Sequence, residues 1–338
     1  MKALVVNENE TLEYKEVDRP VIGKKDVLIK VLGCGICGTD MHVYKGMENN
    51  WPLPGIRGHE FAGIIEECGD EVSRFTIGDH VVVQPMLYCG HCEDCRSGKT
   101  NLCKNTKLVG GELNGGFSEY AKMPEHYVFH VPSNLDTAYY SLVEPVATSI
   151  HGLKGRIPTY TKSMVIFGAG AQGLILVQLA KHLGVQTIIA VDVVNSRLEK
   201  AKECGATYTV NGMEANAMDQ VREFLDGDLA ECVVDAAGIS ITRQQALEVL
   251  KQNGVAIFLA LGAKETSIDF MSLVTKEFKL YGTQCYTDED IQKAIEFIST
   301  GVIDAEKIIT KVPLADGSNA FEQLATNLEY GIKVVLVP

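Results

Sequence analysis

From Lys162 onward, short apolar strands alternate with amphipathic helices, and this alternation restricts the fold more than any other feature of the sequence. The strand-like segment MVIF at 164–167 is followed by a glycine turn, by the helical pattern QGLILVQLAKHLG, and then by the strand-like TIIAVD. The alternation continues as far as FKLYG at 278–282. Short buried strands separated by helices predict a doubly wound parallel sheet with right-handed crossovers.

The first part of the chain has a different pattern. Residues 1 to about 150 contain short segments rich in β-branched residues, such as VLIKVLG and DHVVVQP, separated by glycine and proline. This pattern predicts an all-β, barrel-like domain. After the parallel sheet is complete, residues 286–338 return to helix and end in the strand IKVVLVP. We therefore expect one domain made of residues 1–150 and 286–338, and an inserted domain made of residues 151–285.

The turn between strand and helix reads G-A-G-A-Q-G, with glycines at Gly168, Gly170 and Gly173 and with Gln172 before the last of them. In such a turn the first glycine permits a tight bend, the second lets the backbone approach a pyrophosphate, and the third lets helix and strand pack closely. The N-terminus of the helix then faces the phosphates with its partial positive charge. The turn predicts a dinucleotide site, and a purely structural glycine turn is the alternative.

Asp192 ends the next predicted strand, nineteen residues after Gly173. A carboxylate there accepts hydrogen bonds from both ribose hydroxyls of NAD and repels the 2′-phosphate of NADP. Arg197 is near enough in sequence to serve a 2′-phosphate, but we expect it to flank the adenine or to lie on the surface of its helix. The predicted cofactor is NAD in preference to NADP.

Four cysteines, Cys89, Cys92, Cys95 and Cys103, have the spacing C-x2-C-x2-C-x7-C. Thiolates at this spacing suit tetrahedral Zn²⁺, because short spacers direct successive sulfurs toward one point. Four protein ligands leave no position for water or substrate, so this site, in a lobe near residues 85–105, is predicted to be structural. Disulfide pairing and an iron–sulfur cluster are the less favoured alternatives.

Charge and hydropathy narrow the functional class. The net charge is −13 and the 31 basic residues are scattered over 338 positions, which argues against a nucleic-acid partner. No apolar run has the length of a membrane span, and the first residues lack the pattern of a signal peptide. We therefore expect a cytoplasmic protein that acts on a small molecule. The cysteines outside the proposed metal sites are expected to be small buried side chains, and these are Cys34, Cys68, Cys204, Cys232 and Cys285.

Cys37 and His59 lie outside the cysteine quartet, and spacing alone does not identify them as ligands. Taken as a whole, however, the chain resembles the zinc-dependent medium-chain alcohol and polyol dehydrogenases. The resemblance covers the whole chain and rests on the order and intervals of the quartet and of the segments GICGTDMH, GHEFAG, GDHVVV, GGFSEYA, VEPVATSIHG and GAGAQG. It implies a GroES-like fold for the β domain, a Rossmann fold for the inserted domain, and a homotetramer, or else a dimer, as the assembly.

The resemblance also implies a second, catalytic zinc, so that each subunit holds two zinc ions. Its ligands are Cys37, His59 and a carboxylate, which is either Glu60, directly after the histidine, or Glu144 in the segment VEP. Both glutamates are expected in the site, and the choice between them stays open; apart from the resemblance, Glu144 also fits a carboxylate at the start of a helix. Three protein ligands leave one position for an alcohol oxygen, which loses its proton more readily on a metal.

Further roles follow from the resemblance. Thr39 is expected to accept the proton of the substrate, and His42 to pass it toward solvent through the ribose of the cofactor. Asp40 is expected to orient a metal ligand. Lys333, in the last predicted strand, is expected to bind the pyrophosphate, with a plain edge-strand lysine as the alternative.

The leading functional prediction is the reversible oxidation of a secondary alcohol, in a small polyol or vicinal diol, to a ketone with NAD. An L-threonine 3-dehydrogenase and a sugar-alcohol-phosphate dehydrogenase are the alternatives of the same class. Threonine would require a cation for its carboxylate, for which Arg57 is the only conspicuous candidate near the metal motifs. A catalytically idle binding protein on the same fold is the alternative of another class. Substrate contacts are expected in residues 44–51 and 281–290.

Overall fold

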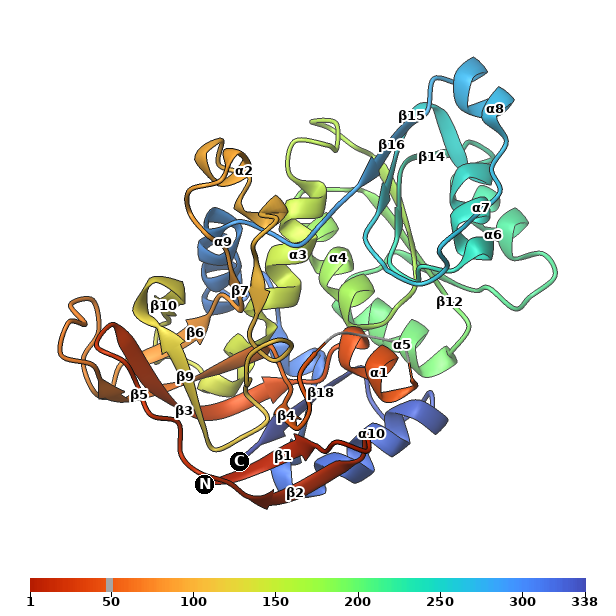
Figure 1. Cartoon of the computed structure of the whole chain (residues 1–338). Helices are drawn as coiled ribbons and strands as arrows, with labels where there is room; N and C mark the ends of the chain where they lie inside the picture. The colour runs from red at the N-terminus through yellow and green to blue at the C-terminus, as the bar shows by residue number, and fades with distance from the viewer. Residues whose placement is uncertain (47–50) are drawn as a thin grey trace. The chain divides into compact units, whose positions relative to one another are not determined.

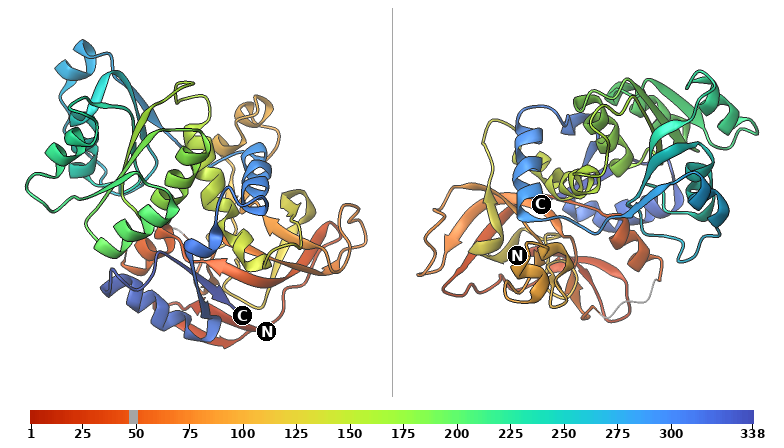
Figure 2. Two further views of the ribbon diagram at one scale, coloured as in Figure 1. Left: turned by 180° about the vertical axis from the view of Figure 1, so that it is seen from behind. Right: turned by 90° about the horizontal axis from the view of Figure 1, so that it is seen from above.

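The computed structural model describes residues 1–46 and 51–338, and the chain divides into two compact units. Unit 1 consists of residues 1–144, 287–300 and 309–338, and unit 2 consists of residues 145–286 and 301–308. Residues 47–50, in one of the segments where substrate contacts are expected, lie outside the described residues. Both ends of the chain belong to unit 1 (Figure 1, Figure 2).

Unit 1 is built mainly from antiparallel strands, as its frequent turn residues predict. Its largest sheet has the order β10-β6-β5-β3-β18-β17, with β9 also paired to β3, and its second sheet has the order β2-β1-β4. Strand β7 pairs with β8, and the cysteine quartet lies between these two strands in the sequence. The strands are β1 (Lys2–Val6), β2 (Leu12–Glu16), β3 (Asp26–Gly35), β4 (Gly55–Ile56), β5 (Glu60–Cys68), β6 (His80–Val83), β7 (Met86–Leu87), β8 (Lys107–Leu108), β9 (Tyr120–Pro124), β10 (Val128–His130), β17 (Ile309–Pro313) and β18 (Lys333–Val337).

Strand β3 is the centre of unit 1. It pairs with β5, β9 and β18 along different parts of its length. Val27 and Ile29, two residues apart and therefore on one face of the strand, lie in the apolar core. At the end of β3, Gly35 is opposite both Glu60, the first residue of β5, and Val335 of β18. Three strands therefore meet beside the candidate metal ligands.

The position of β18 corrects one expectation for Lys333. Because β18 is paired with both β17 and β3, it is an inner strand, and the alternative of an edge-strand lysine is wrong. Lys333 is only 4% exposed. A lysine ammonium at this depth requires a partner for its charge.

Unit 2 contains a six-stranded sheet of parallel strand pairs in the order β13-β12-β11-β14-β15-β16. The chain moves outward from β11 to β13 and then returns to the other side of β11, so the direction of winding changes between β11 and β14. Right-handed crossovers place α4 and α5 on one face and α6 and α7 on the other (Figure 1). This is the doubly wound fold that the alternation predicts. Its strands are β11 (Ser163–Phe167), β12 (Thr187–Asp192), β13 (Tyr208–Asn211), β14 (Ala230–Asp235), β15 (Leu250–Phe258) and β16 (Lys279–Gly282), and its helices are α4 (Ala171–His182), α5 (Asn195–Cys204), α6 (Ala217–Glu223), α7 (Ser240–Glu248) and α8 (Phe270–Thr275).

The other helices contain or flank several of the candidate residues. They are α1 (Gly38–Tyr44), α2 (Glu93–Arg96), α3 (Val143–Leu153), α9 (Asp288–Ser299) and α10 (Gly317–Thr326). Helix α3 begins in unit 1 with Glu144 in its first turn and continues into unit 2. Among the described residues, no helix is both long enough and apolar enough to span a bilayer.

Candidate functional site

Three side chains that the sequence places in two separate motifs come together in unit 1. Ligand atoms of Cys37, His59 and Glu60 all lie within 4.8 Å of one another. Cys37 precedes helix α1, whereas His59 and Glu60 stand at the start of β5, and both of the latter are buried. A thiolate, an imidazole and a carboxylate are the donors that Zn²⁺ takes in proteins, and three of them leave one coordination position open. The donor set therefore fits a catalytic zinc.

Asp40 connects two of these donors. It lies on α1 and is buried, with Oδ2 accepting the backbone N–H of Cys37 at 2.9 Å. Its other oxygen, Oδ1, is 3.9 Å from Nδ1 of His59. A carboxylate behind a ligating histidine holds the ring in one orientation and makes it a stronger donor. At 3.9 Å the two side chains form no hydrogen bond, so the orienting role that the resemblance implies for Asp40 stays a prediction.

Lys333 lies directly beside Glu60. Its ammonium forms an ion pair with Oε2 of Glu60 and donates a hydrogen bond to the backbone oxygen of Ile36 at 3.0 Å. Burial disfavours the charged ammonium, but Glu60 and Cys37 outweigh that effect and the pKa of Lys333 is raised. The lysine therefore carries a full charge, and its partner is the same glutamate that faces the metal donors.

Negative groups surround His59. Burial disfavours its imidazolium, but the charges of Cys37 and Asp40, and more weakly that of Glu144, outweigh burial and raise the pKa of His59 well above its ordinary value. Glu144 thus lies within electrostatic reach of the donors, although the tight group of three contains Glu60. The same negative groups would attract a divalent cation, which would displace the proton of His59.

Thr39 and His42 lie on α1, next to the donor set. Oγ1 of Thr39 is 3.7 Å from Sγ of Cys37. His42 is three residues further along the helix and is half-buried. Because residues three apart are neighbours on a helix, the two side chains lie on one helical face. This arrangement is compatible with the predicted proton path from Thr39 to His42.

A group of glycines, none of which is among the expected site residues, positions the strand β5 that follows His59. Gly58, directly before His59, has φ +92°, and a Cβ on it would lie 2.6 Å from Sγ of Cys34 and 2.7 Å from the ring of Phe117. The backbone N–H of Gly116 donates to the oxygen of Gly58 at 2.8 Å. The paired glycines of GGELNGG are the signal in the sequence, because doubled glycines indicate close approach of two backbones.

Arg57 does not provide a free cation for a substrate carboxylate. It is buried, and its guanidinium donates to the backbone oxygen of Gly111 at 2.8 Å and to that of Pro52 at 3.0 Å. It also lies over the ring of Trp51, 5.4 Å from the centroid. Arg57 therefore holds together the loops on either side of the ligand strand.

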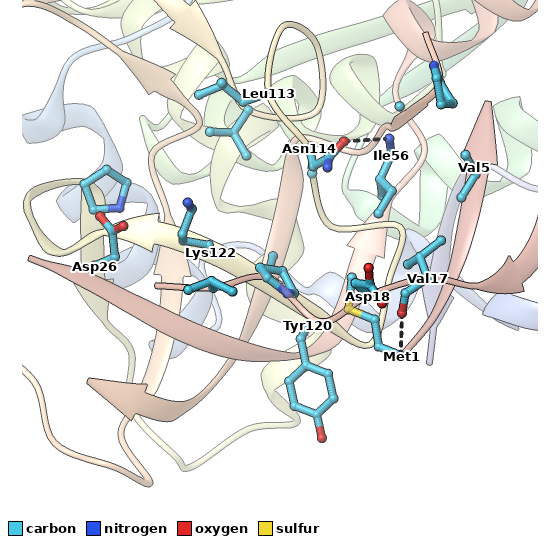
Figure 3. A pocket seen from close by; sticks show the side chains of 18 of the residues that line it. Met1, Val5, Val17, Asp18, Asp26, Ile56, Leu113, Asn114, Tyr120 and Lys122 are labelled. Carbon is cyan, nitrogen blue, oxygen red and sulfur yellow. Dashed lines mark hydrogen bonds between the residues drawn. The ribbon is translucent and has the colours of Figure 1, made fainter. Parts of the chain in front are cut away.

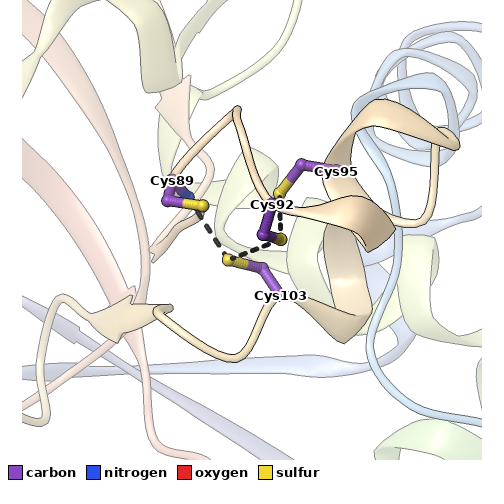
Figure 4. Close-up of side chains that lie close together, drawn as sticks. All are labelled: Cys89, Cys92, Cys95 and Cys103. Atoms are coloured by element: carbon purple, nitrogen blue, oxygen red, sulfur yellow. Dashed lines mark hydrogen bonds between the residues drawn. The ribbon is translucent and has the colours of Figure 1, made fainter.

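The cysteine quartet forms a second candidate metal site. The four sulfurs lie within 4.8 Å of one another and point toward a common centre (Figure 4). Sγ of Cys92 is 3.4 Å from that of Cys95 and 3.9 Å from that of Cys103, and all four cysteines are free thiols. A disulfide needs about 2.05 Å, whereas thiolates about 2.3 Å from one tetrahedral zinc stand about 3.8 Å apart. The donors fit zinc, and the alternative of disulfide pairing is contradicted.

The cysteines of this quartet differ in how readily they form a thiolate. Donors from the backbone of His91 and Cys92 lower the pKa of Cys89 to about 5. The backbone N–H of Cys89 in turn donates to Sγ of Cys103 at 3.3 Å. Burial and the neighbouring thiol of Cys92, in contrast, raise the pKa of Cys95 to about 12. Thiolate is the form that binds a metal, so a bound cation would displace the proton that Cys95 otherwise keeps.

Tyr88 attaches the cysteine lobe to the rest of unit 1. Its hydroxyl donates to Oδ2 of Asp288, the first residue of α9, at 2.6 Å, and is 3.0 Å from Nε2 of His126. Tyr127 donates its own hydroxyl hydrogen to the backbone oxygen of Tyr88. No local sequence pattern signals this attachment, because its members come from three distant segments.

In unit 2 the glycine turn combines a positive φ, an open backbone position and a close approach of two backbone segments. Gly168 has φ +96°, and a Cβ on Gly173 would overlap the backbone oxygen of Gly168. A Cβ on Gly170 would meet none of the described atoms within 4 Å, so the backbone there is open to a ligand. Gln172 is held by Ser149, whose hydroxyl donates to its side-chain oxygen at 2.6 Å. The tight bend at Gly168 and the close approach at Gly173 are thus conformational constraints, and the approach of a pyrophosphate at Gly170 stays a prediction.

Asp192 stands at the end of β12, next to this turn. Its Oδ2 accepts the backbone N–H of Ala169 at 2.6 Å, and its Oδ1 accepts that of Val194 at 3.0 Å. Each carboxylate oxygen has a second lone pair, so the side chain can also accept hydroxyl groups. Arg197 is partly buried in the first turn of α5. The carboxylate is thus fixed against the turn, where a ribose is expected.

A separate hollow of about 640 Å³ lies elsewhere in unit 1 (Figure 3). Apolar side chains of Met1, Val5, Val17, Ile56 and Leu113 form much of its wall. None of the described residues that line it belongs to a candidate metal donor set. This hollow and the candidate metal donors therefore lie in different parts of unit 1. We assign the functional site to the metal donors, because they are the groups that can perform chemistry.

Comparisons with known proteins agree with this site. Residues 23–133 match the model of the alcohol dehydrogenase GroES-like domain, and residues 171–300 match that of the zinc-binding dehydrogenase. Sorbitol dehydrogenase from Bacillus subtilis is 32% identical over 344 residues, which cover 100% of this chain and 97% of that protein. L-threonine 3-dehydrogenase from Bacillus velezensis is 31% identical over 347 residues, which cover 100% and 99%.

A solved structure of a putative zinc-binding dehydrogenase from Sinorhizobium meliloti, bound to NADP, is also similar. Its TM-score with this chain is 0.93, at 29% identity, and the match covers 100% of this chain and 99% of that one. Because the likeness spans nearly all of both chains, it applies to unit 1 and unit 2 alike.

We expect Gly58→Ala to destabilise the protein by about 2–4 kcal/mol, because the new Cβ combines a positive φ with overpacking. Gly78→Ala is the matched control, since Gly78 has φ +97° but a Cβ there meets no described atom within 4 Å. Denaturant unfolding of both variants measures the difference. Equal losses in the two variants would show that packing around Gly58 is unimportant.

We expect Cys103→Ser to lower bound zinc from two ions per chain to one and to reduce the thermal midpoint, because a closed metal site contributes its binding energy to folding. Metal analysis and thermal unfolding provide the two readouts. Cys68→Ser, outside the quartet, is the control and should keep both ions. A full zinc content in Cys103→Ser would exclude the quartet as a zinc site.

Proposed function

Because this chain belongs to the zinc-binding alcohol dehydrogenase family, we propose that it oxidises a secondary alcohol of a small polyol or vicinal diol to a ketone and transfers the hydride to NAD. Membership makes it an oxidoreductase acting on CH–OH donors, with a GroES-like and a Rossmann-like domain as the resemblance implies. We assign catalysis to unit 1 and dinucleotide binding to unit 2. The expected homotetramer and cytoplasmic location stay predictions.

The observation that carries the proposal is the donor set of Cys37, His59 and Glu60, three donors within 4.8 Å of one another. Zinc in this set would act as a Lewis acid that lowers the pKa of an alcohol, and NAD would accept the hydride. Replacing one of the usual thiolates by a carboxylate makes the site harder and better suited to oxygen-rich substrates. A polyol or diol meets that preference with two neighbouring hydroxyls.

The residues in and around the donor set have distinct proposed roles. Cys37 and His59 hold the metal, and Glu60 completes the set, because its carboxylate belongs to the tight group of three. Glu144 provides a second carboxylate whose charge acts on the same site. Lys333 balances the charge of Glu60 and limits the negative charge around the metal. The pyrophosphate contact expected of Lys333 stays a prediction.

Thr39 and His42 provide the route for the proton. The hydroxyl of Thr39, close to Sγ of Cys37, is placed to accept a proton from a substrate hydroxyl. His42, three residues along α1, receives it and releases it to solvent. Asp40 does not take part in this proton transfer in the proposal, because one of its oxygens accepts the backbone N–H of Cys37 and the other faces His59.

The two alternative substrates, L-threonine and a sugar-alcohol phosphate, each carry a negative group that requires cations in the site. L-threonine is favoured by the relative named for that activity, but its carboxylate needs a cation, and the guanidinium of Arg57 donates to backbone oxygens instead. A sugar-alcohol phosphate would need two or more cations, whereas the net charge of the chain is −13. A neutral polyol has neither requirement, so it is the substrate class that we propose.

NAD is proposed as the cofactor because Asp192 places a carboxylate beside the glycine turn. The similar structure from Sinorhizobium meliloti contains NADP, so similarity alone does not select the cofactor. The choice of NAD for this chain rests on the carboxylate of Asp192. A fixed negative charge next to the ribose repels a 2′-phosphate and accepts hydroxyls.

The experiment that tests the function is a panel of NAD reduction with sorbitol, ribitol, 2,3-butanediol, threonine and a hexitol phosphate. We expect the highest kcat/KM with one of the three neutral substrates. Glu60→Gln should reduce kcat by about a hundredfold or more and lower the zinc content, since it removes the charge of a metal donor. Preference for threonine or for the phosphate would overturn the substrate class, and unchanged activity in Glu60→Gln would overturn the site.

We expect Asp192→Ala to raise the ratio of kcat/KM for NADP to that for NAD by at least about tenfold, which corresponds to ~1.4 kcal/mol. The reason is the loss of both the hydroxyl acceptor and the repulsion of the 2′-phosphate. Asp228→Ala, an exposed acidic residue of the same unit paired with Lys251, is the control and should not change the ratio. An unchanged ratio in Asp192→Ala would remove this residue from the ribose site.

A further inference from the structure

A buried ion pair lies at the carboxyl end of the parallel sheet, on the opposite side of the glycine turn from Asp192. Asp235 is the last residue of β14 and is 0% exposed. Arg243, on α7, places its Nε 3.5 Å from Oδ2 of Asp235, and its side chain is 17% exposed. Burial of an ionised carboxylate is costly, so Asp235 requires an opposite charge and hydrogen-bond donors that offset the loss of solvent.

Asp235 is fixed by three donors besides the arginine. Its Oδ1 accepts the backbone N–H of Ala237 at 3.2 Å and of Gly238 at 3.1 Å, and the hydroxyl of Thr242 at 2.9 Å. The loop after β14 is thereby closed around the carboxylate. One oxygen organises this loop, which leaves the other oxygen for Arg243.

That loop lies directly against the glycine turn. Phe167 and Asp235 are register partners at the ends of β11 and β14, so the two loops leave the sheet side by side. A Cβ on Gly168 would be 3.0 Å from the backbone nitrogen of Ala237. This is the position where the winding of the sheet changes direction, and ligands bind outside the strand ends at such a position.

Arg243 connects this arrangement to the next loop, residues 260–266, which follows β15. One terminal nitrogen donates to the backbone oxygen of Ala263 at 2.6 Å and to the hydroxyl of Thr266 at 3.2 Å, and the other donates to the oxygen of Ala260 at 3.4 Å. The loop has no regular secondary structure of its own. A planar guanidinium with several donors can hold two segments at once, which a lysine cannot do.

The two loops also contact each other through the backbone. The N–H of Ala263 donates to the oxygen of Gly238 at 2.8 Å, and the N–H of Leu259 donates to the oxygen of Asp235 at 3.1 Å. Gly238 has φ +75°, and a Cβ on it would be 2.9 Å from Cβ of Ala260. The approach is close enough that a displaced 260–266 loop would also disturb the loop beside the glycine turn.

We infer that Asp235 and Arg243 are positioning residues that hold the 260–266 loop in the conformation that binds the nicotinamide half of the dinucleotide. This inference rests on the proposed function. Asp192, on β12, serves the adenosine ribose, and a dinucleotide that crosses the turn between β11 and β14 reaches the strand ends on the β15 side with its other nucleoside. Arg243 acts through the loop and does not touch the reacting atoms.

The test is to measure the binding of NADH and of AMP to Arg243→Met, with Arg222→Met as control. Arg222 also forms ion pairs in unit 2, with Asp219 and Glu248, but on α6 and at the surface. We expect Arg243→Met to bind NADH about tenfold more weakly, the effect of losing one charge-assisted hydrogen-bond network, while its affinity for AMP is unchanged. Arg222→Met should bind both ligands as the unaltered protein does.

Arg243→Lys keeps the inference testable if the apolar variant does not fold. It retains a positive charge opposite Asp235 but cannot hold Ala260 and Ala263 together, so NADH affinity should still fall, by about threefold, at a nearly unchanged thermal midpoint. Unchanged NADH affinity in a folded variant would overturn the inference, as would an equal loss of NADH and AMP affinity. If the unaltered protein bound no NADH at all, the proposed function itself would fail.

Discussion

The antiparallel pairing of β3 with β5 is the interaction on which the metal site depends. Its register ends with Gly35 opposite Glu60, so Cys37, two residues beyond one strand, and His59, one residue before the other, are brought to the same end. A slip of one residue would turn the side chain of Glu60 to the other face of the sheet. The same end of β3 also pairs with β18, which brings Lys333 to Glu60.

Buried aspartates organise loops at the candidate catalytic metal site, at the glycine turn and after β14. Asp40 accepts the backbone N–H of Cys37, Asp192 accepts that of Ala169, and Asp235 accepts those of the loop after β14. Each carboxylate accepts backbone donors that a helix or sheet leaves unpaired at the end of an element. Charge and loop conformation are therefore set by the same side chain, which gives rigid loops around sites that carry chemistry.

Features with local causes could be predicted from the sequence. The cysteine quartet and the glycine turn each occupy fewer than twenty consecutive residues, and their spacing is a direct consequence of tetrahedral coordination and of a strand-turn-helix bend. The alternation of strands and helices likewise predicted the doubly wound sheet. The family comparisons confirm the two predicted domain types, the GroES-like domain and the Rossmann-like domain.

What the sequence by itself determined is thus local: a loop with four cysteines, a glycine turn between a strand and a helix, and the two types of domain. The resemblance implied that Cys37 and His59 share a site with a glutamate, and tertiary structure decided that Glu60 lies in the tight group with them. Tertiary structure alone decided that Lys333 is an inner-strand lysine paired with Glu60 and that Arg57 donates to backbone oxygens. It also decided that Arg243 joins two loops through Asp235. The physical reason is that spacing within a motif is set by covalent geometry, whereas contacts between distant segments are set by strand register and packing, which no local pattern encodes.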